Sequence, residues 1–65
     1  MWKVRFVDQK DPQQRIAEKS YPTEGECRLA LRLMLDDRAR HLADIEVVAP
    51  GQTLKGDAAI AWARR

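Results

Sequence analysis

The segment Thr23–Leu35 constrains the fold of this chain most, because it predicts one helix with more apolar residues than a single buried face can hold. Thr23 and Glu26 have the spacing of a capping box, in which the hydroxyl accepts a backbone N–H at the helix start and the carboxylate reaches back. The face that a small sheet could bury comprises Cys27, Ala30, Leu31, Met34, Arg38 and Leu42. Leu29 and Leu33 point almost to the opposite side of the helix, so they are apolar residues that the core does not include.

The surplus leucines Leu29 and Leu33 mark a candidate binding surface, because a monomer normally shows polar groups on that side of a helix. Arginines flank them, and arginine beside an apolar centre is typical of the residues that dominate interface energetics. We therefore expect a protein partner, or a second copy of the chain in a homodimer, to cover this surface. The predicted partner-binding residues are Leu29, Leu33, Arg28, Arg32 and Arg40.

The composition is that of one small globular domain spanning residues 1–65. With 45% hydrophobic residues the chain has the apolar side chains that disordered chains lack. A single cysteine cannot form an internal disulfide, which fits a reducing compartment. No apolar run approaches the roughly 20 residues that cross a bilayer, and no signal segment opens the chain. We expect a cytoplasmic protein without a membrane partner.

The remaining sequence predicts a small sheet. Met1–Val7 alternates with the period of a half-buried strand, and a second strand over Gln14–Tyr21 should return beside it as a hairpin. Pro22 ends that strand, the helix is predicted over 23–41, and a third strand over Asp44–Ala49 should run beside the first. The aromatic side chains are interpreted as core residues, namely Trp2, Phe6, Tyr21 and Trp62.

The tail after the Pro50-Gly51 break is compatible with two structures. Gly56-Asp57 could turn the chain into a fourth strand with Ile60 and Trp62 facing inward, or the aspartate could cap a short helix over 58–65. We favour the strand, because it would pair with the third strand and cover an open edge. The expected fold class is a two-layer α+β domain with a mostly antiparallel sheet. Its order is strand, strand, helix, strand, then a fourth strand or short helix, with one helix on one face.

No constellation of side chains indicates catalysis or metal binding. Cys27 and His41 would lie about 21 Å apart on one continuous helix, which excludes a pair of nucleophile and base. The cysteine is interpreted as a small buried residue and the histidine as a cation near the last helical carbonyls, with no second ligand for a metal. Asp36 has the spacing to form a ladder of ion pairs with Arg32 and Arg40. We expect neither an enzyme nor a cofactor-binding protein.

A basic sheet face is the alternative site, and the register of the second strand decides whether it exists. If Ile16 faces the core, the outer face carries a basic stripe suited to phosphate groups. If Ala17 and Tyr21 face the core, Glu18 lies outside against the first strand and neutralises the stripe. Because the net charge is only +2 and the signs are interspersed, we expect nucleic acid to be the less favoured partner. The stripe would comprise Lys3, Arg5, Arg15 and Lys19.

One further pattern covers about fifty residues. It consists of the opening Trp2-x-Val4, the segment Tyr21-Pro22-Thr23 followed by Cys27 at the helix start, and the closing strand Ile45–Pro50. This layout resembles small phage-encoded inhibitors, namely the polypeptide of T7-like phages that binds bacterial RNA polymerase and some short anti-CRISPR proteins. The resemblance implies a protein that occupies the surface of a bacterial host complex and has no chemistry of its own.

Overall fold

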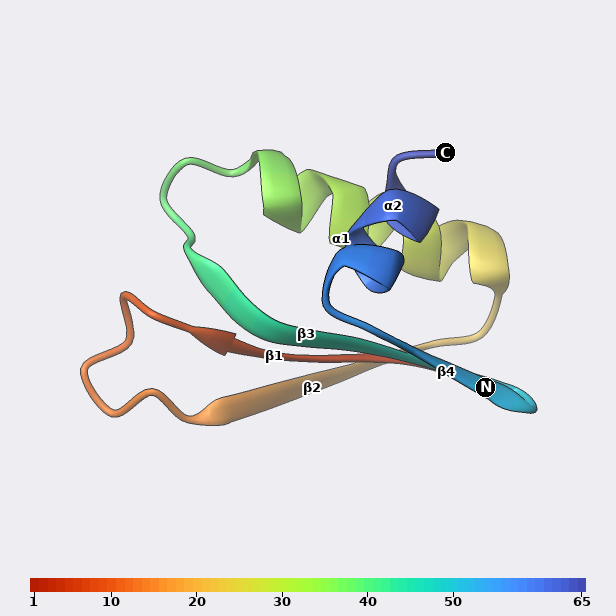
Figure 1. Cartoon of the computed structure of the whole chain (residues 1–65), viewed down its shortest axis with the longest axis horizontal. Coiled ribbons are helices and arrows are strands. Elements are labelled where there is room, and N and C mark those ends of the chain that lie inside the picture. Colours follow the sequence, from red (N-terminus) through yellow and green to blue (C-terminus); the bar gives the residue numbers. More distant parts are fainter.

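A four-stranded antiparallel sheet forms one layer of the computed structural model, which describes residues 1–65, and two helices form the other layer (Figure 1). The strands are β1 (Trp2–Asp8), β2 (Ile16–Tyr21), β3 (Leu42–Ala49) and β4 (Gln52–Lys55), in the spatial order β2-β1-β3-β4. The helices α1 (Glu24–Asp36) and α2 (Asp57–Ala63) lie on the same face of the sheet, and its other face is uncovered (Figure 1). The expected α+β class is confirmed.

The core lies between the sheet and the two helices. β1 contributes Val4 and Phe6 to it, as the alternation of that strand predicts. Of the expected face of α1, Cys27, Leu31 and Met34 are buried, whereas Arg38 and Leu42 lie beyond the helix end. The interpretation of the aromatic residues is confirmed as well, because Phe6 and Trp62 are buried while Trp2 and Tyr21 are half-buried against the core. The buried cluster comprises Val4, Phe6, Cys27, Leu31, Met34, Ile45, Val47, Ala59, Trp62 and Ala63.

The helix α1 begins where the sequence predicts and ends earlier. Thr23 caps the helix as expected, since the Glu26 N–H donates to Thr23 Oγ1 at 3.3 Å. The Glu26 carboxylate reaches back to the Thr23 hydroxyl, which donates to it at 3.1 Å, in place of the backbone N–H of a full capping box. The helix stops at Asp36 instead of His41, because Asp37 has an extended backbone and its carboxylate accepts the Ala39 N–H at 2.9 Å. The segment 37–41 is therefore a connection, and β3 begins two residues earlier than expected.

The tail forms both a strand and a helix, so the favoured single strand after Gly56 is wrong. The Pro50-Gly51 pair makes a tight turn instead of a simple break, with Gly51 at φ +80°, and β4 returns along β3. Gly56 at φ +55° then redirects the chain into α2. The helix is favoured over a strand because packing buries Ala59, Trp62 and Ala63 together on one side of it.

Candidate protein-binding surface on α1

Leu29 and Leu33 lie one turn apart on α1, and we call this pair the α1 surface. Their exposed fractions are 54% and 61%, whereas Leu31 between them is fully buried. The two leucines lie outside the core as predicted, because the opposite face of the helix supplies the core residues Cys27 and Met34. The leucines are thus exposed although the core of the domain is complete without them.

Arg28, one of the predicted flanking residues, packs α2 onto α1. Its Nη2 donates to Glu24 at 3.0 Å, and its guanidinium carbon lies 5.0 Å from the centre of the Trp62 ring. The Nε atom is buried without a partner. The contact of the guanidinium with the Trp62 indole is a cation–π interaction, which strengthens when water is excluded.

Arg32 also holds α2. Its Nε donates to the carbonyl of Ala63 and its Nη2 to the carbonyl of Arg65, both at 3.0 Å. The Ala63 carbonyl belongs to the last turn of α2 and the Arg65 carbonyl follows it, and the helix itself offers no donor to either. The guanidinium therefore stabilises the end of α2 and fixes it against α1.

The predicted ladder of ion pairs along α1 is wrong. Asp36 accepts from Arg64 at 3.0 Å and has no ion pair with Arg32, whose donors serve backbone carbonyls. Arg40 lies beyond the helix end, and its Nε is 3.5 Å from Asp37. The predicted partner-binding set is therefore divided: the two leucines form the exposed centre, while the arginines are engaged in contacts within the domain.

The alternative basic stripe does not form, because Ala17 and Tyr21 face the core side of the sheet. This register places Glu18 opposite Arg5 on the uncovered face, where its carboxylate accepts from Arg5 and lies 3.8 Å from Lys3 Nζ. The other two basic residues are elsewhere. Arg15 pairs with Asp11 in the β1–β2 connection at 3.5 Å, and Lys19 lies on the opposite face of β2 from Lys3 and Arg5.

Cys27 and His41 are not brought together. Cys27 is fully buried in the first turns of α1, and burial raises the pKa of its thiol, as expected for a small core residue. The prediction that His41 meets the last helical carbonyls is wrong, because it follows the helix end by five residues. Its backbone N–H instead donates to Asp8 Oδ1 at 3.3 Å. No group of three or more histidine, cysteine or acidic side chains is arranged to hold a metal ion.

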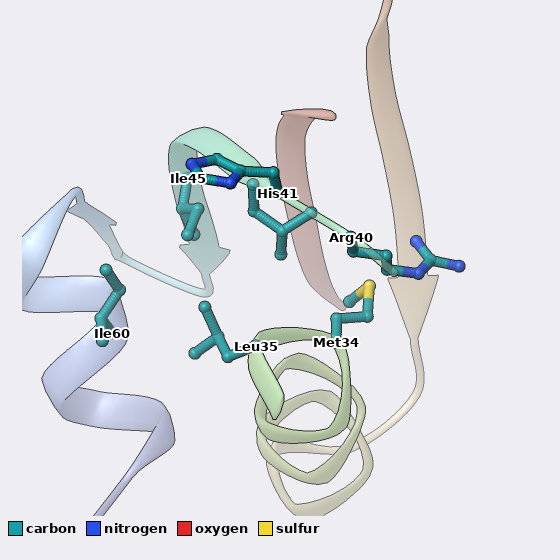
Figure 2. A pocket seen from close by; sticks show the side chains of 7 residues that line it. Met34, Leu35, Arg40, His41, Ile45 and Ile60 are labelled. Atoms are coloured by element: carbon teal, nitrogen blue, oxygen red, sulfur yellow. The ribbon is translucent and has the colours of Figure 1, made fainter. Parts of the chain in front are cut away.

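A pocket of about 210 Å³ lies between the C-terminal end of α1, β3 and α2 (Figure 2). Sequence reasoning missed it, since its walls meet only when the tail forms α2. Figure 2 shows the guanidinium of Arg40 extending away from the pocket toward β2. The lining residues are Met34, Leu35, Arg40, His41, Leu42, Ile45 and Ile60.

Comparison of the chain with protein-family models, curated proteins and solved structures gives no match. Neither α1 nor α2 has the length and apolar character that a membrane-crossing helix requires.

Proposed function

We propose that this protein is a non-enzymatic binding module that docks on another protein through the α1 surface and acts by occupying part of that partner. The observation that carries the proposal is the exposure of Leu29 and Leu33, at 54% and 61%, one turn apart on a helix whose other face is buried. Covering two such side chains removes apolar area from water, which favours association.

The contacts around the α1 surface support a preorganised site. Arg28 and Arg32 fix α2 beside α1, so the helix that presents the leucines has little freedom to rearrange. A rigid surface loses less conformational entropy on binding, and this raises affinity for a given contact area. The remaining donors of both guanidiniums can form the polar rim around an apolar centre.

The layout of elements supports an inhibitor of the phage type. β1, β2, α1 and β3 follow one another in the order that the small phage inhibitors share. Under this proposal the partner is a protein complex of a bacterial host, and the site of action is the cytoplasm. Inhibition follows from steric occupation, so it requires no catalytic group.

The test replaces the α1 surface with charges. The double variant Leu29→Asp/Leu33→Asp should keep its thermal midpoint within a few degrees of wild type, because substitutions at exposed positions change stability little. It should fail to retain the protein that wild type captures from a nuclease-treated bacterial lysate, or fail to dimerise in sedimentation velocity. Ala61→Asp, an exposed position on α2, is the matched control and should behave as wild type.

Two outcomes contradict the proposal. A large loss of stability of the double variant, when wild type is a monomer, would show that the leucines belong to the core. Unchanged capture and unchanged self-association by a folded double variant would show that the α1 surface binds nothing.

A further inference from the structure

β2 is an open edge of the sheet, because it pairs with β1 on one side only. It has six residues, whereas the other edge strand, β4, has four and leads directly into α2. Short edge strands are poor templates for pairing, and longer ones present a row of free backbone N–H and C=O groups. β2 is therefore the longer open edge, and its charged residues Glu18 and Lys19 disfavour indiscriminate pairing, so an added strand has to complement them.

The α1 surface and the β2 edge lie on the same flank of the molecule. α1 packs against β1 and β2, and α2 packs against β3 and β4. Arg28 and Arg32 occupy the side of α1 that faces α2. Leu29 and Leu33 follow these arginines around the helix, away from α2, which turns them toward the β2 flank. A partner that covers the leucines can therefore extend to the edge strand.

The two faces of β2 offer different chemistry to an added strand. Lys19 lies opposite Val4 on the helix-covered face, is exposed and forms no ion pair, while Arg40 extends toward the same strand (Figure 2). On the uncovered face, Ile16 lies opposite Val7 and is 75% exposed. Glu18 on that face is already paired with the cations of β1. The edge therefore favours an acidic residue on one face and an apolar residue on the other.

A second copy of β2 does not meet this requirement. Two antiparallel copies that continue one sheet about a two-fold axis place residues of the same face opposite each other. In such a pair Lys19 lies opposite Ala17, Tyr21 or the second Lys19, because Glu18 is on the other face, so no register sets a carboxylate opposite it. Centring the pair on Glu18 or Lys19 also sets two like charges opposite each other. Like charges directly opposite destabilise a strand pair. The charges of the strand thus favour a foreign segment over self-pairing.

We propose that the β2 edge binds an extended segment of the partner protein as a fifth strand, with an acidic side chain of that segment facing Lys19 and an apolar side chain beside Ile16. This inference rests on the proposed function and names the conformation and chemistry of the partner. Backbone hydrogen bonds supply affinity in such strand addition, and alternate side chains supply specificity.

The test selects a displayed library of random decapeptides separately for binding to wild type, to Lys19→Glu and to Lys55→Glu. Lys55 is a lysine of the other edge strand, β4, so Lys55→Glu is the matched control. Wild type and Lys55→Glu should enrich alternating sequences with an acidic residue at one position, and Lys19→Glu should enrich a basic residue there. The wild-type consensus peptide should bind Lys19→Glu roughly fivefold more weakly, as expected for reversal of a cross-strand charge pair. Amide exchange should slow along β2 when the peptide binds.

Twins of the consensus peptide test the backbone. Every second backbone N–H of an added strand points toward β2, so two twins are made, each with N-methyl groups on one of the two alternating sets of amides. Both twins keep every side chain. The twin methylated on the amides that face β2 should lose at least about tenfold in affinity. The inference is overturned if no sequence is enriched, if the Lys19→Glu consensus is unchanged, or if the N-methylated twins of both registers bind as well as the parent. Such a result leaves the aspartate test of the α1 surface unaffected, so the two failures are distinguishable.

Discussion

Glu18 sets the charge of the uncovered sheet face, because its carboxylate serves two cations of β1. It accepts from Arg5 Nε and lies 3.8 Å from Lys3 Nζ, and all three side chains are partly exposed. The hydrogen bond from Arg5 lowers the pKa of Glu18, and the same bond raises the pKa of Arg5. Exposed pairs of this kind add little stability individually, yet here the pair removes a basic patch.

The lowered pKa of Glu18 predicts how stability depends on pH. Its folded-state pKa lies below the ordinary value of 4.5, so the ionised carboxylate adds stability that is present above 4.5 and is lost as the pH falls through the folded-state pKa. The free energy of unfolding of wild type should therefore fall more steeply below 4.5 than that of Glu18→Gln. Urea unfolding at a series of pH values measures both slopes, with Glu46→Gln on the same face as the control. Equal slopes for wild type and Glu18→Gln would contradict the assignment.

At the scale of elements, α2 depends on contacts with the rest of the domain. A helix of seven residues is too short to persist alone in water. The Trp62 ring stacks on Trp2 with centroids 5.6 Å apart and an interplanar angle of 10°, and Arg28 lies over the same indole. Arg32 fixes the last carbonyls, and Arg64 pairs with Asp36 of α1. Trp62 makes two of these contacts, the stack on Trp2 and the cation–π contact with Arg28, and it is the largest buried side chain of α2.

Trp62→Ala should lower the free energy of unfolding by roughly 3–5 kcal/mol, the range for removing a buried aromatic side chain. Trp62→Phe keeps a ring in the stack and should lose less. Urea denaturation followed by far-ultraviolet circular dichroism measures both without relying on tryptophan fluorescence. A loss below about 1 kcal/mol for the alanine variant would mean that α2 contributes little to the fold.

The beginning of α1 could be predicted from the sequence and its end could not. Thr23 and Glu26 act through a contact between near neighbours, so their spacing is sufficient. The end depends on Asp37, whose carboxylate accepts the Ala39 N–H. The sequence after Asp36 has a similar local propensity for this turn and for a continued helix, so propensity does not decide between them. The tail illustrates the same limit, since α2 is selected by the stack of Trp62 on Trp2, a contact between distant parts of the sequence.

For the candidate site, periodicity was sufficient to place Leu29 and Leu33 outside the core. It could not assign the arginines, because Arg28 and Arg32 are adjacent to α2 only once the tail has folded back. The sequence likewise left two possible registers of β2, each with a different charge on the uncovered sheet face. The structure has the register in which Tyr21 and Ala17 face the core.

At the scale of the whole molecule, the charges are distributed and mutually compensated. The net charge is +2, and the four residues of the alternative basic stripe lie in three different settings. Lys3 and Arg5 share a carboxylate, Arg15 pairs with Asp11, and Lys19 is on the other face of the sheet. Nucleic-acid affinity derives mainly from several phosphate contacts made together, and this surface does not align them.

We therefore expect no submicromolar binding to DNA or RNA at about 150 mM salt, where the screening length is roughly 8 Å. Fluorescence anisotropy with labelled single- and double-stranded probes measures it. Replacing all four basic residues of the alternative stripe by glutamine should change nothing at this salt concentration. Tight, sequence-tolerant binding that these replacements abolish would instead establish that some of these four basic residues form a nucleic-acid site.

The stack of Trp2 on Trp62 also bears on how the domain is made in the cell. The central strand β1 is synthesised early, but its partner β3 and the indole that covers it follow much later in the chain. Contacts between distant segments form slowly and close the native structure last. Until Trp62 leaves the ribosome, the nascent chain can pair its strands but cannot form α2 over the sheet, so part of the core face stays uncovered. Folding should therefore complete in one late step, and a ribosome stalled before Trp62 emerges should present a protease-sensitive chain.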